Sequence, residues 1–127
     1  MQLNEQVYGD VVVLIPGGIN IGDEEIDPLR ERVKAIIGEG FLKIVLDLEK
    51  IRWVNSAGLG TMIASLTSLN NKGGDLRLAK ISDRIQSLFL ITQLVKVFKT
   101  FETVDRAVAS FLVDPISGVP VEQDTTS

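Results

Sequence analysis

The stretch Asp47-Leu-Glu-Lys-Ile-Arg-Trp-Val-Asn-Ser-Ala-Gly-Leu-Gly60 decides the fold, because it joins a strand pattern to a helix pattern. An almost unbroken apolar run between residues 41 and 48 leads into it, which is typical of a strand covered on both faces. After it, apolar residues recur at helical spacing as far as Lys72-Gly73-Gly74, namely Leu59, Met62, Ile63, Leu66 and Leu69. The sequence therefore predicts a central strand and then a helix, with Ser56 at or just before the helix N-terminus.

Ser56 has two interpretations. In the first, Asn55 or Ser56 caps the helix, because the side-chain oxygen of either residue type accepts a hydrogen bond from an unpaired N–H group of the first turn. In the second, the turn holds a phosphoserine. The N–H groups of Gly58, Leu59 and Gly60 would then face the phosphate, and the helix dipole would favour its negative charge. The local pattern leaves both interpretations open.

For three residues before the turn, the sequence favours a structural role over a functional one. Trp53 is predicted to be an anchor beneath the turn, with its N–H paired locally. Asp47 and Glu49 alternate at a strand end beside Lys50 and Arg52, so solvated or ion-paired carboxylates are favoured over an acid–base pair.

The helix that follows Ser56 carries an uncharged strip. No charged residue occurs from Ala57 to Asn71, whereas exposed helix faces usually carry charges. The face opposite the apolar stripe presents Thr61, Ala64, Ser65 and Ser68. We expect this strip to be a docking surface for a partner protein; the alternative is that it packs against a neighbouring helix of the same domain.

Composition limits the function classes. The chain has 127 residues, enough for one domain with a single core, and its 45% hydrophobic and 24% charged content is that of a globular protein. The net charge is −4, but residues 1–113 carry 13 basic and 14 acidic side chains and no basic run. Nucleic acid and anionic membrane surfaces are therefore not expected as partners.

Cysteine and histidine are both absent. Their absence excludes disulfides, zinc sites of the Cys/His type, thiolate nucleophiles and a Ser-His-Asp triad. We expect no enzymatic activity, no cofactor and no metal site. The first residues lack a signal-peptide pattern, and the longest apolar run, Val11–Ile15, is too short to cross a bilayer, so a cytoplasmic protein without membrane insertion is predicted.

The remaining elements are predicted in order along the chain. Strands are expected at residues 2–8, 10–16, 75–81 and 96–101, and helices from Asp27-Pro28 to Gly38, from Asp83 to Leu94 and over residues 104–111. Gly9-Asp10 suits a two-residue hairpin turn. The apolar arc of the helix from Asp83 is so wide that this helix is either well buried or offers apolar surface.

The predicted fold is α/β. An antiparallel hairpin opens a mixed sheet, βα units with right-handed crossovers follow, and the total is about five strands and four helices. Residues 1–113 are predicted to form the domain. Residues 114–127 include Pro115, Gly118 and Pro120 and show no apolar period, so they are predicted to be a disordered acidic tail.

The segment Val54-Asn-Ser-Ala-Gly-Leu-Gly60 resembles the phosphorylation turn of the STAS family, which includes bacterial anti-sigma factor antagonists and domains of sulphate transporters. The resemblance extends in element order over residues 3–112. The family turn is Asp-Ser-Ser/Thr-Gly-Leu-Gly, so the resemblance implies that Ser56 is the phosphorylation site and that Gly58 and Gly60 are the glycine pair.

The resemblance also implies partners. A stand-alone member of this size is an anti-sigma factor antagonist. Unphosphorylated, it binds an anti-sigma factor that is a serine kinase and displaces the sigma factor; phosphorylated, it dissociates, and a metal-dependent serine phosphatase resets it.

Two positions depart from the family turn. Asn55 replaces Asp, which keeps a hydrogen-bond acceptor but removes a charge beside the serine, and Ala57 replaces a hydroxyl residue. Asn55 favours the alternative function, a STAS module that binds constitutively as a scaffold or transport-complex partner.

Overall fold

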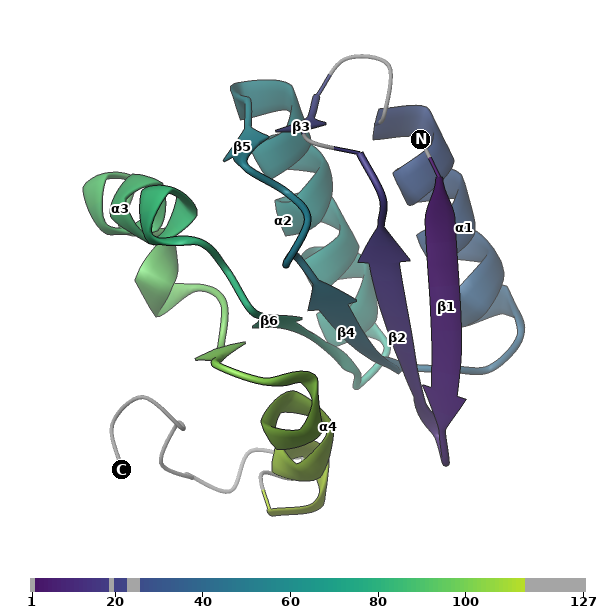
Figure 1. Ribbon diagram of the computed structural model, residues 1–127. Helices are drawn as coiled ribbons and strands as arrows, with labels where there is room; N and C mark the ends of the chain where they lie inside the picture. The colour runs from purple at the N-terminus through teal and green to yellow at the C-terminus, as the bar shows by residue number, and fades with distance from the viewer. Residues whose placement is uncertain (1, 19, 23–25, 114–127) are drawn as a thin grey trace.

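A five-stranded mixed sheet with strand order β1-β2-β4-β6-β7 forms the centre of the computed structural model, which describes residues 2–18, 20–22 and 26–113 (Figure 1). The strands are β1 (Leu3–Tyr8), β2 (Val11–Pro16), β4 (Lys43–Asp47), β6 (Asp75–Ala79) and β7 (Thr100–Phe101). β1 pairs antiparallel with β2, and the other neighbours are parallel. The predicted fold class is confirmed.

The opening hairpin has the predicted two-residue turn. Tyr8 pairs with Val11, and Gly9 between them has a φ of +63°, a backbone conformation that glycine adopts without steric cost.

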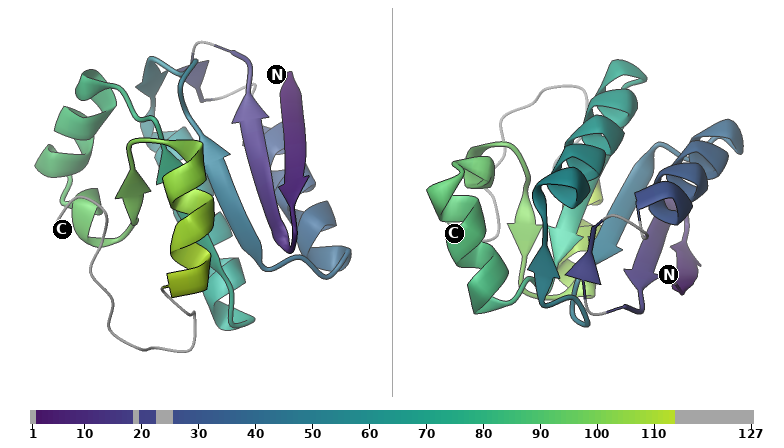
Figure 2. Two further views of the ribbon diagram at one scale, coloured as in Figure 1. Left: turned by 60° about the horizontal axis from the view of Figure 1, so that its bottom comes forward. Right: turned by 90° about the horizontal axis from the view of Figure 1, so that it is seen from above.

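Helices cover both faces of the sheet (Figure 2). α1 (Ile26–Gly38) and α2 (Ser56–Asn71) lie on one face, and α4 (Val104–Val113) lies on the other. Alternate residues of one strand enter different cores: Val12 and Leu14 of β2 join the core under α1 and α2, whereas Val11 and Val13 join the core under α4. This double coverage explains why β2 and β4 are apolar at almost every position.

The segment between β6 and α4 differs from its prediction. α3 (Asp83–Ile91) ends three residues earlier than expected, and a 3₁₀ helix, η2 (Leu94–Lys96), replaces the start of the predicted strand, which is reduced to β7. The N–H groups of Val97 and Phe98 both donate to Leu94 O. Leu94 and Phe98 are both buried in the same core, and a spacing of four residues places two side chains on one face of a helix or of a strand alike, so this spacing does not distinguish the two.

Two further strands were not predicted. β3 (Asn20–Ile21) and β5 (Trp53–Val54) form a small parallel pair beside the N-terminus of α2. α1 begins at Ile26, one residue before the predicted start, so Asp27 lies in its first turn. The predicted tail, residues 114–127, lies outside the described residues.

β6 is buried on both faces from residue 76 to residue 79. Arg77 and Ala79 are 1% and 0% exposed because α4 covers them.

Candidate functional site

The turn between β5 and α2 is held by Asn55. This residue is the N-cap of α2, with extended backbone angles, and its Oδ1 accepts a hydrogen bond of 2.8 Å from the N–H of Gly58. The Asn55 N–H donates to Ile21 O of β3, and Asn55 O accepts the first intrahelical bond, from Leu59 N–H. Of the two cap candidates the structure therefore selects Asn55, and Ser56 is the first helical residue.

Two glycines near the turn are required by packing. A Cβ on Gly58 would lie 2.5 Å from Ile21 O, and a Cβ on Gly22 would lie 2.4 Å from the Asn55 amide nitrogen. Both distances are too short for any side chain, so these glycines let β3, Asn55 and α2 approach one another. Gly60 has open space where its Cβ would be, so packing does not explain it.

The expectation that three N–H groups face a phosphate is wrong. The Gly58 and Leu59 N–H groups are already bonded to the side chain and the carbonyl of Asn55, and Gly60 N–H takes part in the helix ladder. Helix geometry instead leaves the N–H groups of Ser56 and Ala57 without an intrahelical acceptor.

Ser56 is exposed at the positive end of the α2 dipole, with Ala57 and Gly60 exposed beside it. Its hydroxyl makes no hydrogen bond with any residue that the structure describes. The first turn of α2 contains no acidic residue, so no carboxylate of that turn would repel an added anion. This arrangement presents a hydroxyl to a partner and can accept a phosphate without breaking the cap.

Trp53 is not the buried anchor that was predicted. It is 36% exposed, and the guanidinium carbon of Arg84, on α3, lies 4.8 Å from the centroid of its ring. The stacked cation supplies the packing that a buried position would have given. Sequence reasoning missed Arg84 altogether, since no local pattern links positions 53 and 84.

The uncharged strip on α2 is divided between core and surface. Thr61 and Ser65 are each 7% exposed, so the expectation that they are exposed is wrong; Ser65 Oγ donates to Thr61 O at 2.9 Å. α1 packs against this side of α2. Ala64 and Ser68 are exposed at a shallow groove between the two helices, which Arg30, Lys34 and Ile37 of α1 also line. The strip is therefore partly the internal contact that was the alternative interpretation.

The acidic pair before the turn has structural partners. Asp47 Oδ1 accepts a hydrogen bond from Glu49 N–H at 3.0 Å, and Glu49 pairs with Lys80 Nζ at 3.5 Å. Among residues 2–18, 20–22 and 26–113, the structure contains no group of acidic side chains that could hold a metal ion. No helix in the same part of the chain is long and apolar enough to cross a membrane.

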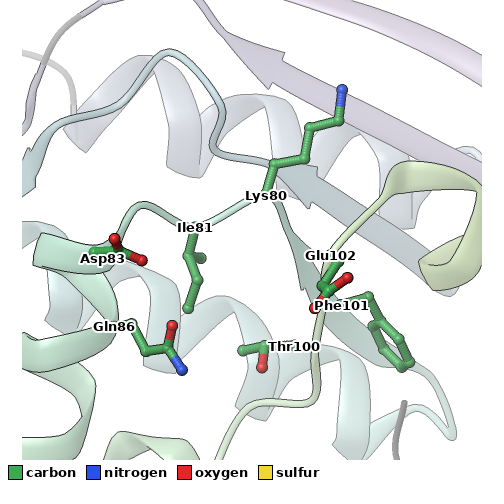
Figure 3. Close-up of a pocket in the computed structure, with 7 residues that line it drawn as sticks. All are labelled: Lys80, Ile81, Asp83, Gln86, Thr100, Phe101 and Glu102. Atoms are coloured by element: carbon green, nitrogen blue, oxygen red, sulfur yellow. The ribbon is translucent and has the colours of Figure 1, made fainter. Parts of the chain in front are cut away.

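A hollow of about 260 Å³ lies between α3 and β7 and was not predicted (Figure 3). Its lining includes Asp83 and Gln86 of α3, Thr100 of β7, and Glu102. Lys80 also borders it but points away in Figure 3, in keeping with its ion pair to Glu49. Ser56 does not line this hollow.

A family model, curated relatives and solved structures all relate this chain to STAS domain proteins. Residues 3–107 match the sequence model of the STAS domain. BtrV of Bordetella bronchiseptica, a proposed anti-sigma factor antagonist, is 23% identical over 84% of this chain and 90% of its own length.

Solved structures share the fold. A proposed anti-sigma factor antagonist of Thermotoga maritima superposes with a TM-score of 0.78 at 24% identity, over 85% of this chain and 92% of that one. The anti-sigma factor antagonist SpoIIAA of Bacillus, in its phosphorylated form, superposes with a TM-score of 0.65 at 20% identity, over 85% and 96% of the two chains.

Proposed function

This chain belongs to the STAS domain family, and from that premise we propose that it is an anti-sigma factor antagonist switched by phosphorylation of Ser56. In its unphosphorylated form it binds an anti-sigma factor that is a serine kinase, and the sigma factor is released. Phosphorylation of Ser56 ends this binding, and a metal-dependent serine phosphatase restores it. The protein acts without enzymatic activity of its own, in the cytoplasm.

The position of Ser56 carries the proposal. The capping hydrogen bond belongs to Asn55, so the Ser56 hydroxyl has no structural task in the helix start and is exposed. A phosphate adds about −1.5 to −2 charges at neutral pH. At the N-terminus of α2 the helix dipole offsets that charge, whereas an interface closed over a neutral hydroxyl would have to desolvate it. Phosphorylation would therefore leave the fold intact and remove the partner.

The relatives support the general function. BtrV and the Thermotoga maritima protein carry the name of proposed anti-sigma factor antagonists, and SpoIIAA has been solved in both its phosphorylated and its unphosphorylated form.

A second candidate is a STAS module that binds its partner constitutively, as a scaffold or a component of a transport complex. Asn55 favours it, because the amide caps α2 but places no negative charge beside Ser56.

A phosphorylation experiment separates the two. The protein is incubated with ATP and the anti-sigma factor kinases of its own organism, and phosphate is mapped by mass spectrometry, with Ser56→Ala as the control. We expect phosphate on Ser56 alone and weaker calorimetric binding of the kinase by the phosphorylated form. Phosphate uptake by the Ser56→Ala variant at the wild-type level, or equal binding by both forms, would rule out the switch.

A further inference from the structure

Exposed large apolar side chains gather at one side of the molecule. Among the described residues, four of the seven lie on β5, on α3 or directly after η2: Trp53 is 36% exposed, Leu90 59%, Ile91 82% and Val97 46%. The other three lie on the opening hairpin and at the end of α4. We call the four residues, together with Arg84, the α3 face. A cluster of this kind on one side of a small domain is typical of an interaction site.

The α3 face is continuous with the Ser56 turn. α3 lies beside β5 in Figure 1, and the stacking of Arg84 on Trp53 joins the two elements. β5 then leads through Asn55 directly into Ser56. A protein that covers the Ser56 hydroxyl would therefore lie within reach of the α3 face.

The exposed charges of this region are mostly positive. Arg52, Arg84 and Lys96 are exposed there, and Asp83 is the one exposed acidic side chain in the segments 52–56 and 83–97. The chain as a whole has a net charge of −4, so this excess is local. A partner that fits such a surface presents apolar side chains bordered by carboxylates.

We propose that the α3 face is the main docking surface for the anti-sigma factor, which meets it with an acidic, apolar-centred patch. This inference rests on the proposed function. Tryptophan and arginine are the residue types most often found at the energetic centre of protein interfaces, and here they are stacked together. A symmetric dimer through the same face would bring like charges together, because each copy would present the same basic residues to the other.

The charge of the α3 face also explains how a phosphate on Ser56 could weaken binding of a partner at residues that the phosphate does not touch. Three basic and one acidic side chain give the region a charge of +2. A phosphate on Ser56 adds about −1.5 to −2, which cancels most of it and with it the attraction for an acidic partner.

The test uses matched variants of the full chain. Ile91→Ser removes an exposed apolar side chain from the α3 face, and Leu112→Ser removes one of nearly equal exposure, 83%, from α4. Arg84→Glu reverses a charge on the face. Arg106→Glu reverses one on α4, where glutamate suits the helix start because Thr103 Oγ1 caps the Arg106 N–H. Thermal melts establish that each variant is folded.

Each variant is titrated by calorimetry with the anti-sigma factor of the same organism. We expect Ile91→Ser and Arg84→Glu to bind at least about tenfold more weakly than wild type, and both α4 variants to bind within about twofold of it. Wild-type binding with no difference between the α3 and α4 variants would overturn this inference and leave the proposed function standing. Failure of the wild type to bind would overturn both. A wild-type dimer that Ile91→Ser converts to a monomer, measured by light scattering, would assign the face to a second copy and overturn the inference.

Discussion

Arg77 on β6 and Ser110 on α4 are joined by a hydrogen bond of 2.7 Å, from Nη1 to Oγ, in a site almost closed to solvent. Nε of the same guanidinium donates to Asp75 Oδ2 at 2.9 Å, and its carbon lies 4.0 Å from the centroid of the Phe111 ring. A single buried cation thus connects the sheet to the helix that covers its second face.

Replacing Arg77 should lower the free energy of unfolding, and the loss should depend on how much of the side-chain volume the new residue keeps. Arg77→Ala removes the ion pair and leaves a gap under α4, so we expect the free energy of unfolding to fall by about 3–5 kcal/mol. Arg77→Met keeps most of the volume against Phe111 and should cost clearly less. Urea denaturation measures both. Equal losses in the two variants would mean that packing contributes little at this site.

The uncharged strip on α2 yields a paired prediction. Ser68 is exposed and Ser65 is buried against α1, one helical turn apart. Ser68→Lys should leave the free energy of unfolding within about 0.5 kcal/mol of wild type, whereas Ser65→Lys should lower it by about 1–3 kcal/mol through overpacking. If Ser68→Lys or Ala64→Lys remains stable but binds the anti-sigma factor more weakly, the exposed part of the strip is contact surface. Unchanged binding by both would remove it from the interface.

The order of elements could be predicted because each depends on local pattern. The Gly9-Asp10 turn, the apolar run of β4 and the stripe from Leu59 to Leu69 all act within a few residues, and the structure confirms the hairpin, the central strand and α2. The burial of Arg77 could not be predicted, because it depends on α4, more than 25 residues further along the chain.

In the candidate site, too, features set by local sequence could be predicted and features set by distant residues could not. The sequence located Ser56 at a helix start but could not choose between Asn55 and Ser56 as the cap, since both residue types cap well. The choice is made by β3, whose Ile21 carbonyl accepts the Asn55 N–H and fixes that residue in an extended conformation. The contact between Arg84 and Trp53 could not be predicted either, because the two residues lie on different elements, α3 and β5.

Residues 114–127 are expected to be dispensable for folding, because their sequence has no apolar period and contains Pro115 and Pro120. A chain that ends at Val113 should melt within a few degrees of the full-length chain. Circular dichroism during heating provides the measurement. A large fall in melting temperature would mean that the tail packs on the domain.

Asn55 should contribute more to the stability of the domain than Ser56, because Asn55 is the N-cap of α2. Asn55→Ala removes the bond to Gly58 N–H and should cost about 0.5–2 kcal/mol, whereas Asn55→Asp preserves the cap. Asn55→Asp also restores the residue usual in the STAS turn, so timed phosphate incorporation at Ser56 should be faster than in wild type. An unchanged rate would show that the missing charge does not limit phosphorylation.

Substitutions of Ser56 separate the switch from the constitutive binder. Because Asn55 supplies the cap, Ser56→Ala should change the free energy of unfolding by less than about 0.5 kcal/mol, and Ser56→Asp should raise it by about 0.3–1 kcal/mol through the helix dipole. If Ser56 is a switch residue, binding follows the opposite order: the Ala variant binds the anti-sigma factor as wild type does, and the Asp variant binds more weakly. Thermal melts rank the Ala and Asp variants by stability, and calorimetric titrations rank them by affinity for the anti-sigma factor. Because Asp stabilises the isolated domain, weaker binding by that variant has to arise in the interface. Equal affinity of the Ala and Asp variants, together with no phosphate on wild type, would instead identify a constitutive binder.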